Sequence, residues 1–216
     1  MRITVFGSSG RTGRLIVRAL LEQGHTVVAA VRNPKHVADL TALGAEVRLV
    51  DLRDGAFGDI VAAIAGSDAV IFAAGSAVGE SSELDRIGTR RTVRAAEKAG
   101  VKRYLSIASI GASTGMSTRG WGAEMQDYYK QKRAAGRLIR ASSLDWTLLD
   151  PAELTDGSAT GRVTASLAAI KETAISRADV AAAAVLLLAD RRAIGKAVQL
   201  AGGDSPLEAA LTRALG

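Results

Sequence analysis

A glycine-rich segment near the N-terminus has the residue types and the spacing that bind phosphate groups. It reads Gly7-Ser8-Ser9-Gly10-Arg11-Thr12-Gly13, follows a short apolar run at 3–6 and opens a stretch with helical spacing. Glycine lacks the Cβ that would block a pyrophosphate, and the N–H groups at a helix start face the phosphates. The contacts expected with a dinucleotide come from Gly7, Ser9, Gly10, Arg11, Thr12 and Gly13. The structural alternative is a tight turn without a ligand.

The next strand end carries an arginine at a position that determines cofactor choice. Proteins that bind NAD place an acidic residue at the end of the second strand, where it accepts from the ribose 2′-hydroxyl. This chain reads Val31-Arg32-Asn33-Pro34 instead. A guanidinium binds a 2′-phosphate, so Arg32 predicts NADP(H) in preference to NAD(H), with Arg11 and Lys35 as helpers. The alternative is a solvated surface arginine.

Two further strand ends have residues that suit a nucleotide. Asp51 and Leu52 follow the third apolar run, where Asp51 either accepts from the adenine amine or caps a turn. Ala73, Ala74 and Gly75 end the fourth run, and their small size would let the ribose approach. A generic turn is an equally good interpretation of that second segment.

The elements that must position these residues alternate along the chain. Apolar runs at 3–6, 26–31, 46–50, 69–74, 103–110, 146–149 and 196–201 are separated by helical patterns, the clearest at 12–23, 57–64, 83–99, 125–141 and 177–189. Alternation of this kind predicts an α/β fold: one Rossmann-type, doubly wound parallel sheet with helices on both faces. Residues 1–216 are expected to form a single domain, in which 150–174 is the least regular segment.

Composition excludes several other classes of protein. The 216 residues include no cysteine and two histidines, which excludes disulfides and thiolate sites and leads us to expect no metal site. The longest apolar stretch, 181–189, is too short to span a bilayer, and no signal peptide pattern precedes the first run, so we expect a cytoplasmic protein without a membrane partner. The net charge of +6 accompanies no base-reading motif, and we expect no nucleic-acid partner.

Taken in order along the chain, these motifs resemble the short-chain dehydrogenase/reductase superfamily. More narrowly, the chain is similar to the atypical NAD(P)H-binding group that includes biliverdin IXβ/flavin reductase. The resemblance extends over nearly the whole chain. It rests on the glycine turn, the segments at 31–34 and 51–53, and three later segments at 102–111, 144–151 and 173–181.

The resemblance implies a catalytic set of serine, tyrosine and lysine. The tyrosine and lysine of this superfamily stand at Tyr-x-x-x-Lys spacing, which places both on one helix face. Here they match Tyr128 and Lys132, with Ser109 as the serine. Lys132 would hold the nicotinamide ribose, Tyr128 would exchange a proton and Ser109 would position the substrate oxygen. The alternative for Tyr128 is an aromatic residue that covers the core edge.

These features predict an NADPH-dependent oxidoreductase that reduces a small conjugated acceptor such as a flavin, a quinone or a carbonyl compound. The acceptor would lie between segments 111–123 and 152–169, with Trp121 as a lid or a loop anchor. The rival hypothesis is a non-catalytic NADP(H)-binding redox sensor, similar to NmrA-like regulators. The chain is expected to be a monomer or a homodimer.

Overall fold

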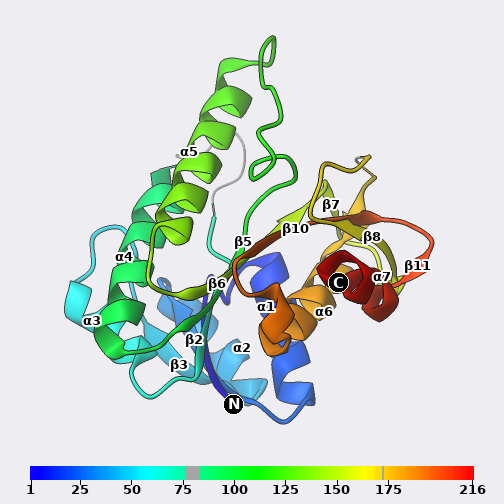
Figure 1. The fold of residues 1–216 in the computed structure, drawn as a ribbon. Helices are drawn as coiled ribbons and strands as arrows, with labels where there is room; N and C mark the ends of the chain where they lie inside the picture. The colour runs from blue at the N-terminus through cyan, green and yellow to red at the C-terminus, as the bar shows by residue number, and fades with distance from the viewer. Residues whose placement is uncertain (76–82, 172) are drawn as a thin grey trace.

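The computed structural model of the protein describes residues 1–75, 83–171 and 173–216. Strands and helices alternate from the N-terminus to β6, as Figure 1 shows. The elements of this first part are β1 (Arg2–Phe6), α1 (Arg11–Glu22), β2 (Thr26–Val31), α2 (Val37–Ala42), β3 (Glu46–Leu49), α3 (Phe57–Ile64), β4 (Ala69–Phe72), α4 (Glu83–Ala99), β5 (Arg103–Ile107), α5 (Ala123–Arg140) and β6 (Asp145–Pro151). The later elements are β7 (Leu154–Thr155), β8 (Arg162–Ser166), β9 (Ile175–Ser176), α6 (Arg177–Ala189), β10 (Lys196–Gly202), β11 (Ser205–Pro206) and α7 (Leu207–Leu215).

One sheet forms the centre of the structure, with the order β11-β8-β10-β6-β5-β4-β1-β2-β3. The strands from β3 to β10 pair in parallel, and the order reverses between β1 and β4, where open α/β sheets bind their ligands. The predicted doubly wound Rossmann-type fold is therefore confirmed. The sheet is mostly rather than wholly parallel, because β8 and β11 add an antiparallel edge beside β10.

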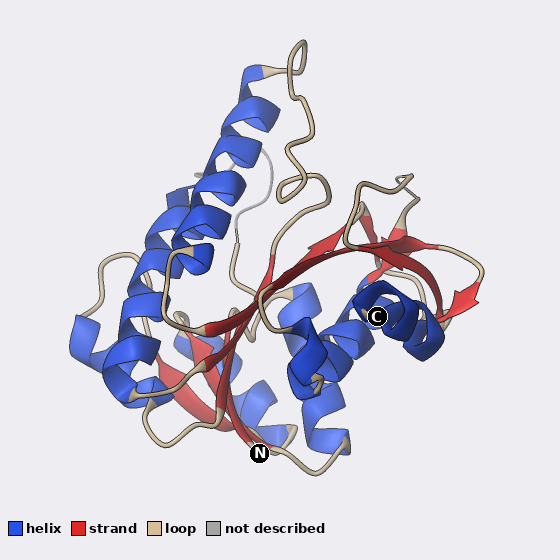
Figure 2. Cartoon of the chain, viewed as in Figure 1, coloured by secondary structure: helices blue, strands red, loops and turns tan. Residues whose placement is uncertain are grey.

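Helices cover both faces of the sheet, as predicted (Figure 2). One core lies under α1, α2, α6 and α7 and includes Ile16, Leu40 and Val180. The other lies under α3, α4 and α5 and includes Ile60 and Ile139. Both cores are built mainly from aliphatic side chains, and they hold the strand ends and the helix starts in fixed positions.

Two helix ends have the glycine and the capping serine that the sequence predicts. The first helix ends next to Gly24, whose φ of +76° favours glycine, and α6 begins at Ser176, whose hydroxyl accepts from the N–H of Asp179 at 2.9 Å. The helix expected at 125–141 spans Ala123–Arg140 instead. None of the helices among the described residues is long and apolar enough to cross a membrane.

Part of the structure extends beyond the sheet on the side where the strands end. The N-terminal half of α5 and the loop that leads into it rise together from the body of the molecule (Figure 1). That loop contains segment 111–122, so the first of the two segments expected to hold the acceptor stands over the carboxyl ends of the strands.

Candidate cofactor and active site

The glycine turn packs so tightly that its own backbone requires glycine. A Cβ on Gly13 would lie 2.1 Å from the carbonyl oxygen of Gly7, and one on Gly7 would lie 2.5 Å from the backbone nitrogen of Ala74. Gly7 also has a φ of +83°, which other residues rarely adopt. The turn is therefore pressed against the end of β4, and this contact fixes where α1 begins.

The start of α1 is open to an anion. Its N-cap residue, Gly10, contributes no side-chain hydrogen bond, and the first turn contains no acidic residue. The first backbone N–H groups of a helix lack partners within it, and the helix dipole attracts negative charge to that end. This arrangement fits a pyrophosphate, as the sequence predicts.

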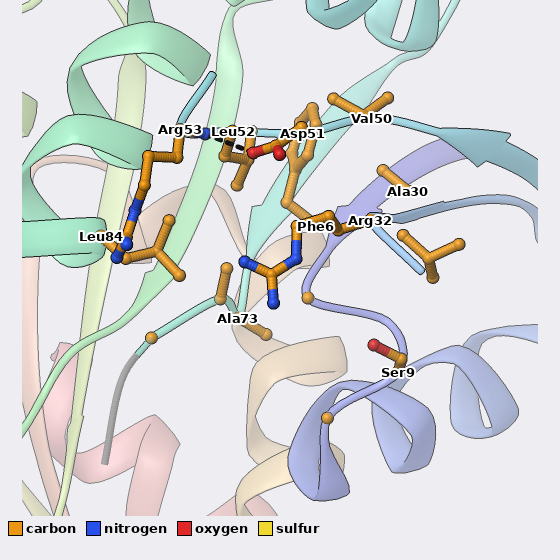
Figure 3. Close-up of a pocket in the computed structure, with 15 residues that line it drawn as sticks. Phe6, Ser9, Ala30, Arg32, Val50, Asp51, Leu52, Arg53, Ala73 and Leu84 are labelled. Atoms are coloured by element: carbon orange, nitrogen blue, oxygen red, sulfur yellow. Dashed lines mark hydrogen bonds between the residues drawn. The ribbon is translucent and has the colours of Figure 1, made fainter. Parts of the chain in front are cut away.

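A cavity of about 430 Å³ opens beside this turn, at the carboxyl ends of β1 to β4 (Figure 3). The predicted cofactor residues that line it are Gly7, Ser9, Gly10, Arg32, Asp51, Leu52, Ala73, Ala74 and Gly75. Phe6, Arg53 and Leu84 line it as well, although the sequence analysis did not assign them to the cofactor. Arg11, Thr12, Gly13 and Lys132 are not among its lining residues.

Two guanidinium groups belong to the wall of this cavity. Arg32 follows β2 and extends into the cavity in Figure 3, and Arg53 follows β3. Asp51 stands between them in the chain, but its Oδ1 accepts from the backbone N–H of Arg53 at 2.8 Å and of Asp54 at 3.3 Å. One oxygen of Asp51 therefore caps its own turn, the alternative considered from the sequence.

The turn that carries Asp51 and Arg53 is braced from α4. The guanidinium of Arg91 donates to the carbonyl oxygens of Leu52 at 3.3 Å, of Arg53 at 2.6 Å and of Gly55. This brace fixes one wall of the cavity before a ligand binds. No short sequence motif indicates it, because Arg91 lies 38 residues beyond Arg53.

Arg11 does not line the cavity, and its side chain pairs with the segment after β6. Its guanidinium pairs with Asp156 at 2.6 Å, and Arg177 at the start of α6 pairs with the same carboxylate at 2.6 Å. The Arg11 side chain is 70% exposed. Asp156 thus links the glycine turn to one of the two segments expected to hold the acceptor.

The predicted catalytic residues divide into two groups in the structure. Lys132 and Tyr128 lie together on α5, with the Lys132 ammonium 5.4 Å from the centre of the Tyr128 ring. Ser109, after β5, has its hydroxyl 3.5 Å from the hydroxyl of Tyr129 rather than Tyr128. The Tyr129 hydroxyl in turn donates to the carbonyl oxygen of Ile110 at 3.0 Å.

Trp121 contacts this second group. Its ring meets that of Tyr129 edge to face, with 5.4 Å between the ring centres, and its side chain is 37% exposed. The buried Tyr129 therefore anchors the loop at two points, through Trp121 and through Ile110. Tyr128 is half-buried and remains the more accessible of the two phenols.

Lys132 has a buried partner that the sequence analysis missed. Its ammonium is 2.7 Å from Oδ1 of Asp85, in the first turn of α4. Burial lowers the pKa of Lys132, but Asp85, Tyr128 and Asp150 together outweigh this effect, with Asp85 the strongest of the three, so the pKa lies above its ordinary value. In the sequence Asp85 resembles any acidic residue that favours a helix N-terminus, so only its burial distinguishes it.

A second buried carboxyl group, at the end of β6, is hydrogen-bonded to the loop that follows β5. Asp150, at the end of β6, accepts from the Ser113 N–H at 3.1 Å and from the Gln199 amide at 2.8 Å. Burial raises the pKa of Asp150. Gln199 also accepts from the N–H of Gly111 at 2.9 Å, so this pair holds the base of the loop at 111–113.

No cluster of three or more metal-ligating side chains occurs in the parts of the chain that the structure describes.

Comparison with known proteins identifies the family. The model of a family described as NAD(P)H-binding matches residues 7–191. The chain belongs to this NAD(P)H-binding family. The resemblance to atypical short-chain dehydrogenase/reductase proteins, expected from the sequence, is therefore confirmed.

Relatives of this NAD(P)H-binding chain carry the names of reductases and epimerases. It is 31% identical to the "Uncharacterized sugar epimerase YhfK" of Bacillus subtilis (strain 168), over 99% of this chain and 100% of that protein. It matches the structure of the oxidoreductase ylbE from Lactococcus lactis with a TM-score of 0.86 and 27% identity, covering 100% of this chain and 97% of the other. It matches ChuY, an anaerobillin reductase from Escherichia coli O157:H7, with a TM-score of 0.81 and 26% identity, covering 95% and 98%. The family is thus oxidoreductase- and epimerase-like.

Proposed function

We propose that the protein is an NADPH-dependent reductase of a small conjugated acceptor: a flavin, a quinone or a carbonyl compound. The observation that carries this proposal is the position of Gly75. It lines the cofactor cavity, and a Cβ on it would lie 3.3 Å from the Lys132 ammonium. A hydrogen-bonding cation, with Tyr128 next to it, therefore stands beside a residue of the cavity wall.

The choice of NADP(H) over NAD(H) rests on positive charge in the cavity wall. Arg32 and Arg53 both line the cavity, and Asp51 uses one oxygen to cap its own turn. Two guanidinium groups suit the 2′-phosphate of NADP(H) better than the bare 2′-hydroxyl of NAD(H). Arg32 follows β2 directly, so it is the primary ligand in this proposal.

In the proposed reaction the bound cofactor supplies a hydride from its nicotinamide ring. Lys132 would hydrogen-bond the nicotinamide ribose and keep the ring beside Gly75. The phenol of Tyr128 would give a proton to the atom of the acceptor that becomes negatively charged, and solvent would return it. Ser109 would orient the acceptor, and its hydroxyl is held near Tyr129.

The character of the acceptor follows from segments 111–123 and 152–169. Each carries a large exposed apolar side chain, Trp121 at 37% and Leu167 at 42% exposure. A cavity of about 170 Å³ lies between the two segments, lined by apolar and uncharged residues that include Ile110, Met116 and Gln199. Apolar walls with few polar groups are typical of sites for planar organic ligands.

The test combines binding with turnover. The protein is titrated with NADPH and NADH while its tryptophan fluorescence is recorded, and oxidation of NADPH is then followed at 340 nm with flavin, quinone and aldehyde acceptors. Arg32→Ala is expected to weaken NADPH binding about 10- to 100-fold, the effect of losing a charged hydrogen bond, and to leave NADH binding unchanged. Equal loss for both cofactors would contradict the assignment of Arg32.

The rival function, a redox sensor without catalysis, has one observation in its favour. The hydroxyl of Ser109 lies 3.5 Å from that of Tyr129, which donates to the Ile110 carbonyl, so the hydrogen bond of the serine is with Tyr129 and not with the proposed proton donor. Tight NADPH binding with no oxidation across the acceptor panel would support the sensor.

A further inference from the structure

Asp85 and Lys132 form a buried ion pair between two helices. The carboxylate comes from α4 and the ammonium from α5, and 2.7 Å separates Oδ1 from Nζ. Their side chains are only 3% and 8% exposed. A buried charge is retained only when a partner compensates it, and Asp85 compensates the buried ammonium of Lys132.

The pair lies directly against the cofactor cavity. A Cβ at position 75 would stand 3.2 Å from Oδ1 of Asp85 and 3.3 Å from Nζ of Lys132. Gly75 follows β4 and itself lines the cavity. Because Gly75 has no side chain, nothing at that position separates the ion pair from a ligand in the cavity.

Among the groups that favour the charged form of Lys132, Asp85 has the strongest effect. Burial lowers the pKa of Lys132, and Asp85 is the strongest opposing influence, followed by the weaker effects of Tyr128 and Asp150. Among the described residues, the titratable groups that act on the ammonium are Asp85 from α4, Tyr128 from α5 and Asp150 from β6. The nearby Arg86 of α4 donates to Gln131 at 3.1 Å. Asp85 is the one of these acidic groups that forms an ion pair with Lys132.

We propose that Asp85 is a positioning residue for the nicotinamide half of the cofactor. It acts as the fixed counter-ion of Lys132, keeps the ammonium charged and holds it beside Gly75, where the nicotinamide ribose would lie. The inference rests on the proposed function, which places NADPH in the cavity. It adds that the cavity wall at Gly75 adjoins an ion pair without net charge, which suits an uncharged acceptor.

The charge of Lys132 is measured directly, without turnover. Protein labelled with ¹³C at the lysine ε-carbon is titrated by NMR, and the Lys132 signal is assigned with Lys132→Met. In the wild type the signal stays constant from about pH 6 to about pH 10, because Asp85 holds the proton on the ammonium. In Asp85→Asn the signal titrates with a midpoint at least about one pH unit below that of an ordinary lysine, since desolvation is no longer opposed.

Cofactor affinity supplies the second readout. In Asp85→Asn, NADPH binding is expected to weaken at least about ten-fold between about pH 7 and about pH 10, as Lys132 loses its charge. The wild type is expected to show no such change. Asp85→Glu retains the carboxylate with a longer arm, so Lys132 stays charged while NADPH binds a few-fold more weakly.

A matched variant separates positioning from folding. Thr92 is also buried on α4, and its hydroxyl is 2.8 Å from that of Tyr104. Thr92→Val disturbs the same helix without touching the ion pair, so it is expected to lower stability and to leave both pH readouts unchanged. Should Asp85→Asn fail to fold, the Glu variant still tests the proposal through its NADPH affinity and its lysine signal.

Three results of the lysine titration and the NADPH binding measurements would overturn the proposed role of Asp85 in different ways. A Lys132 signal in Asp85→Asn that matches the wild type would show that another group is the counter-ion. A lysine that loses its charge while NADPH binding stays constant would overturn the positioning role. Absence of NADPH binding by the wild type would overturn the proposed function and with it the cofactor role of Asp85, and the lysine titration would still report on the ion pair.

Discussion

Replacing Gly13 with alanine tests whether the glycine turn is held by its own packing. Gly13 is the third residue of α1, and a Cβ there would lie 2.1 Å from the carbonyl oxygen and 2.8 Å from the carbonyl carbon of Gly7. Both contacts are with backbone atoms, so no side chain can rotate away. Either α1 or the turn must move, and the turn is already pressed against Ala74.

The size of the effect follows from two opposing contributions. Alanine in place of glycine stabilises a helix by up to about 1 kcal/mol. Overpacking of a rigid site costs typically about 1–3 kcal/mol, and at 2.1 Å from backbone we expect the upper part of that range. Gly13→Ala should therefore lower the free energy of unfolding by about 1–2 kcal/mol, or reduce the melting temperature by about 2–8 °C.

Gly58 provides the matched control. It is the second residue of α3, and no atom lies within 4 Å of the position that a Cβ would take. Gly58→Ala gains the helix preference without the collision, so it should stabilise the protein by up to about 1 kcal/mol. Urea unfolding of both variants, with NADPH titration alongside, gives the comparison.

The two variants should also differ in cofactor binding. Gly13→Ala displaces the start of α1, where the pyrophosphate is expected, so NADPH affinity should fall with stability, whereas Gly58→Ala should bind as the wild type does. Equal stability of the two variants would refute the steric argument. A destabilised Gly13→Ala protein with unchanged NADPH affinity would refute the link between the turn and the cofactor.

Two further predictions concern buried charged groups. Burial lowers the pKa of Arg103 to about 10, and its guanidinium donates to the carbonyl oxygens of Leu187 and Leu188 near the end of α6. Arg103→Met should lower the free energy of unfolding in urea by about 2–4 kcal/mol, because it leaves these oxygens unpaired. Arg192→Met, at an exposed ion pair, should have a much smaller effect. Burial raises the pKa of Asp150, so the folded state holds its proton longer than the unfolded state and stability falls as pH rises through the folded pKa. Asp150→Asn should therefore become more stable relative to the wild type as pH increases. Thermal unfolding of both proteins from about pH 4 to about pH 8 tests this, and a melting-temperature difference that stays constant over the range would contradict a raised pKa for Asp150.

Much of the fold could be predicted from local pattern because each element has its own signal. Apolar runs of strand length alternate with helical spacing, and Gly24 and Ser176 mark helix ends through backbone conformation and capping. The segment after β6 was less predictable. Strand β8 is recognised by its antiparallel pairing with β10 and β11, and that pairing joins residues far apart in the chain. The final helix, α7, has apolar residues at helical spacing, so local pattern is sufficient to predict it.

The sequence by itself determined the residues whose role depends on neighbours in the chain. The glycine turn, Arg32 after its strand and the i, i+4 placement of Tyr128 and Lys132 all follow from local geometry. Only the tertiary structure decided which groups meet across elements: Tyr129 with Ser109, Arg91 with the turn after β3, and Asp85 with Lys132. The physical reason is burial. An acidic residue in the first turn of a helix is ordinary in sequence, and it determines the charge of a distant lysine only when packing removes both from water.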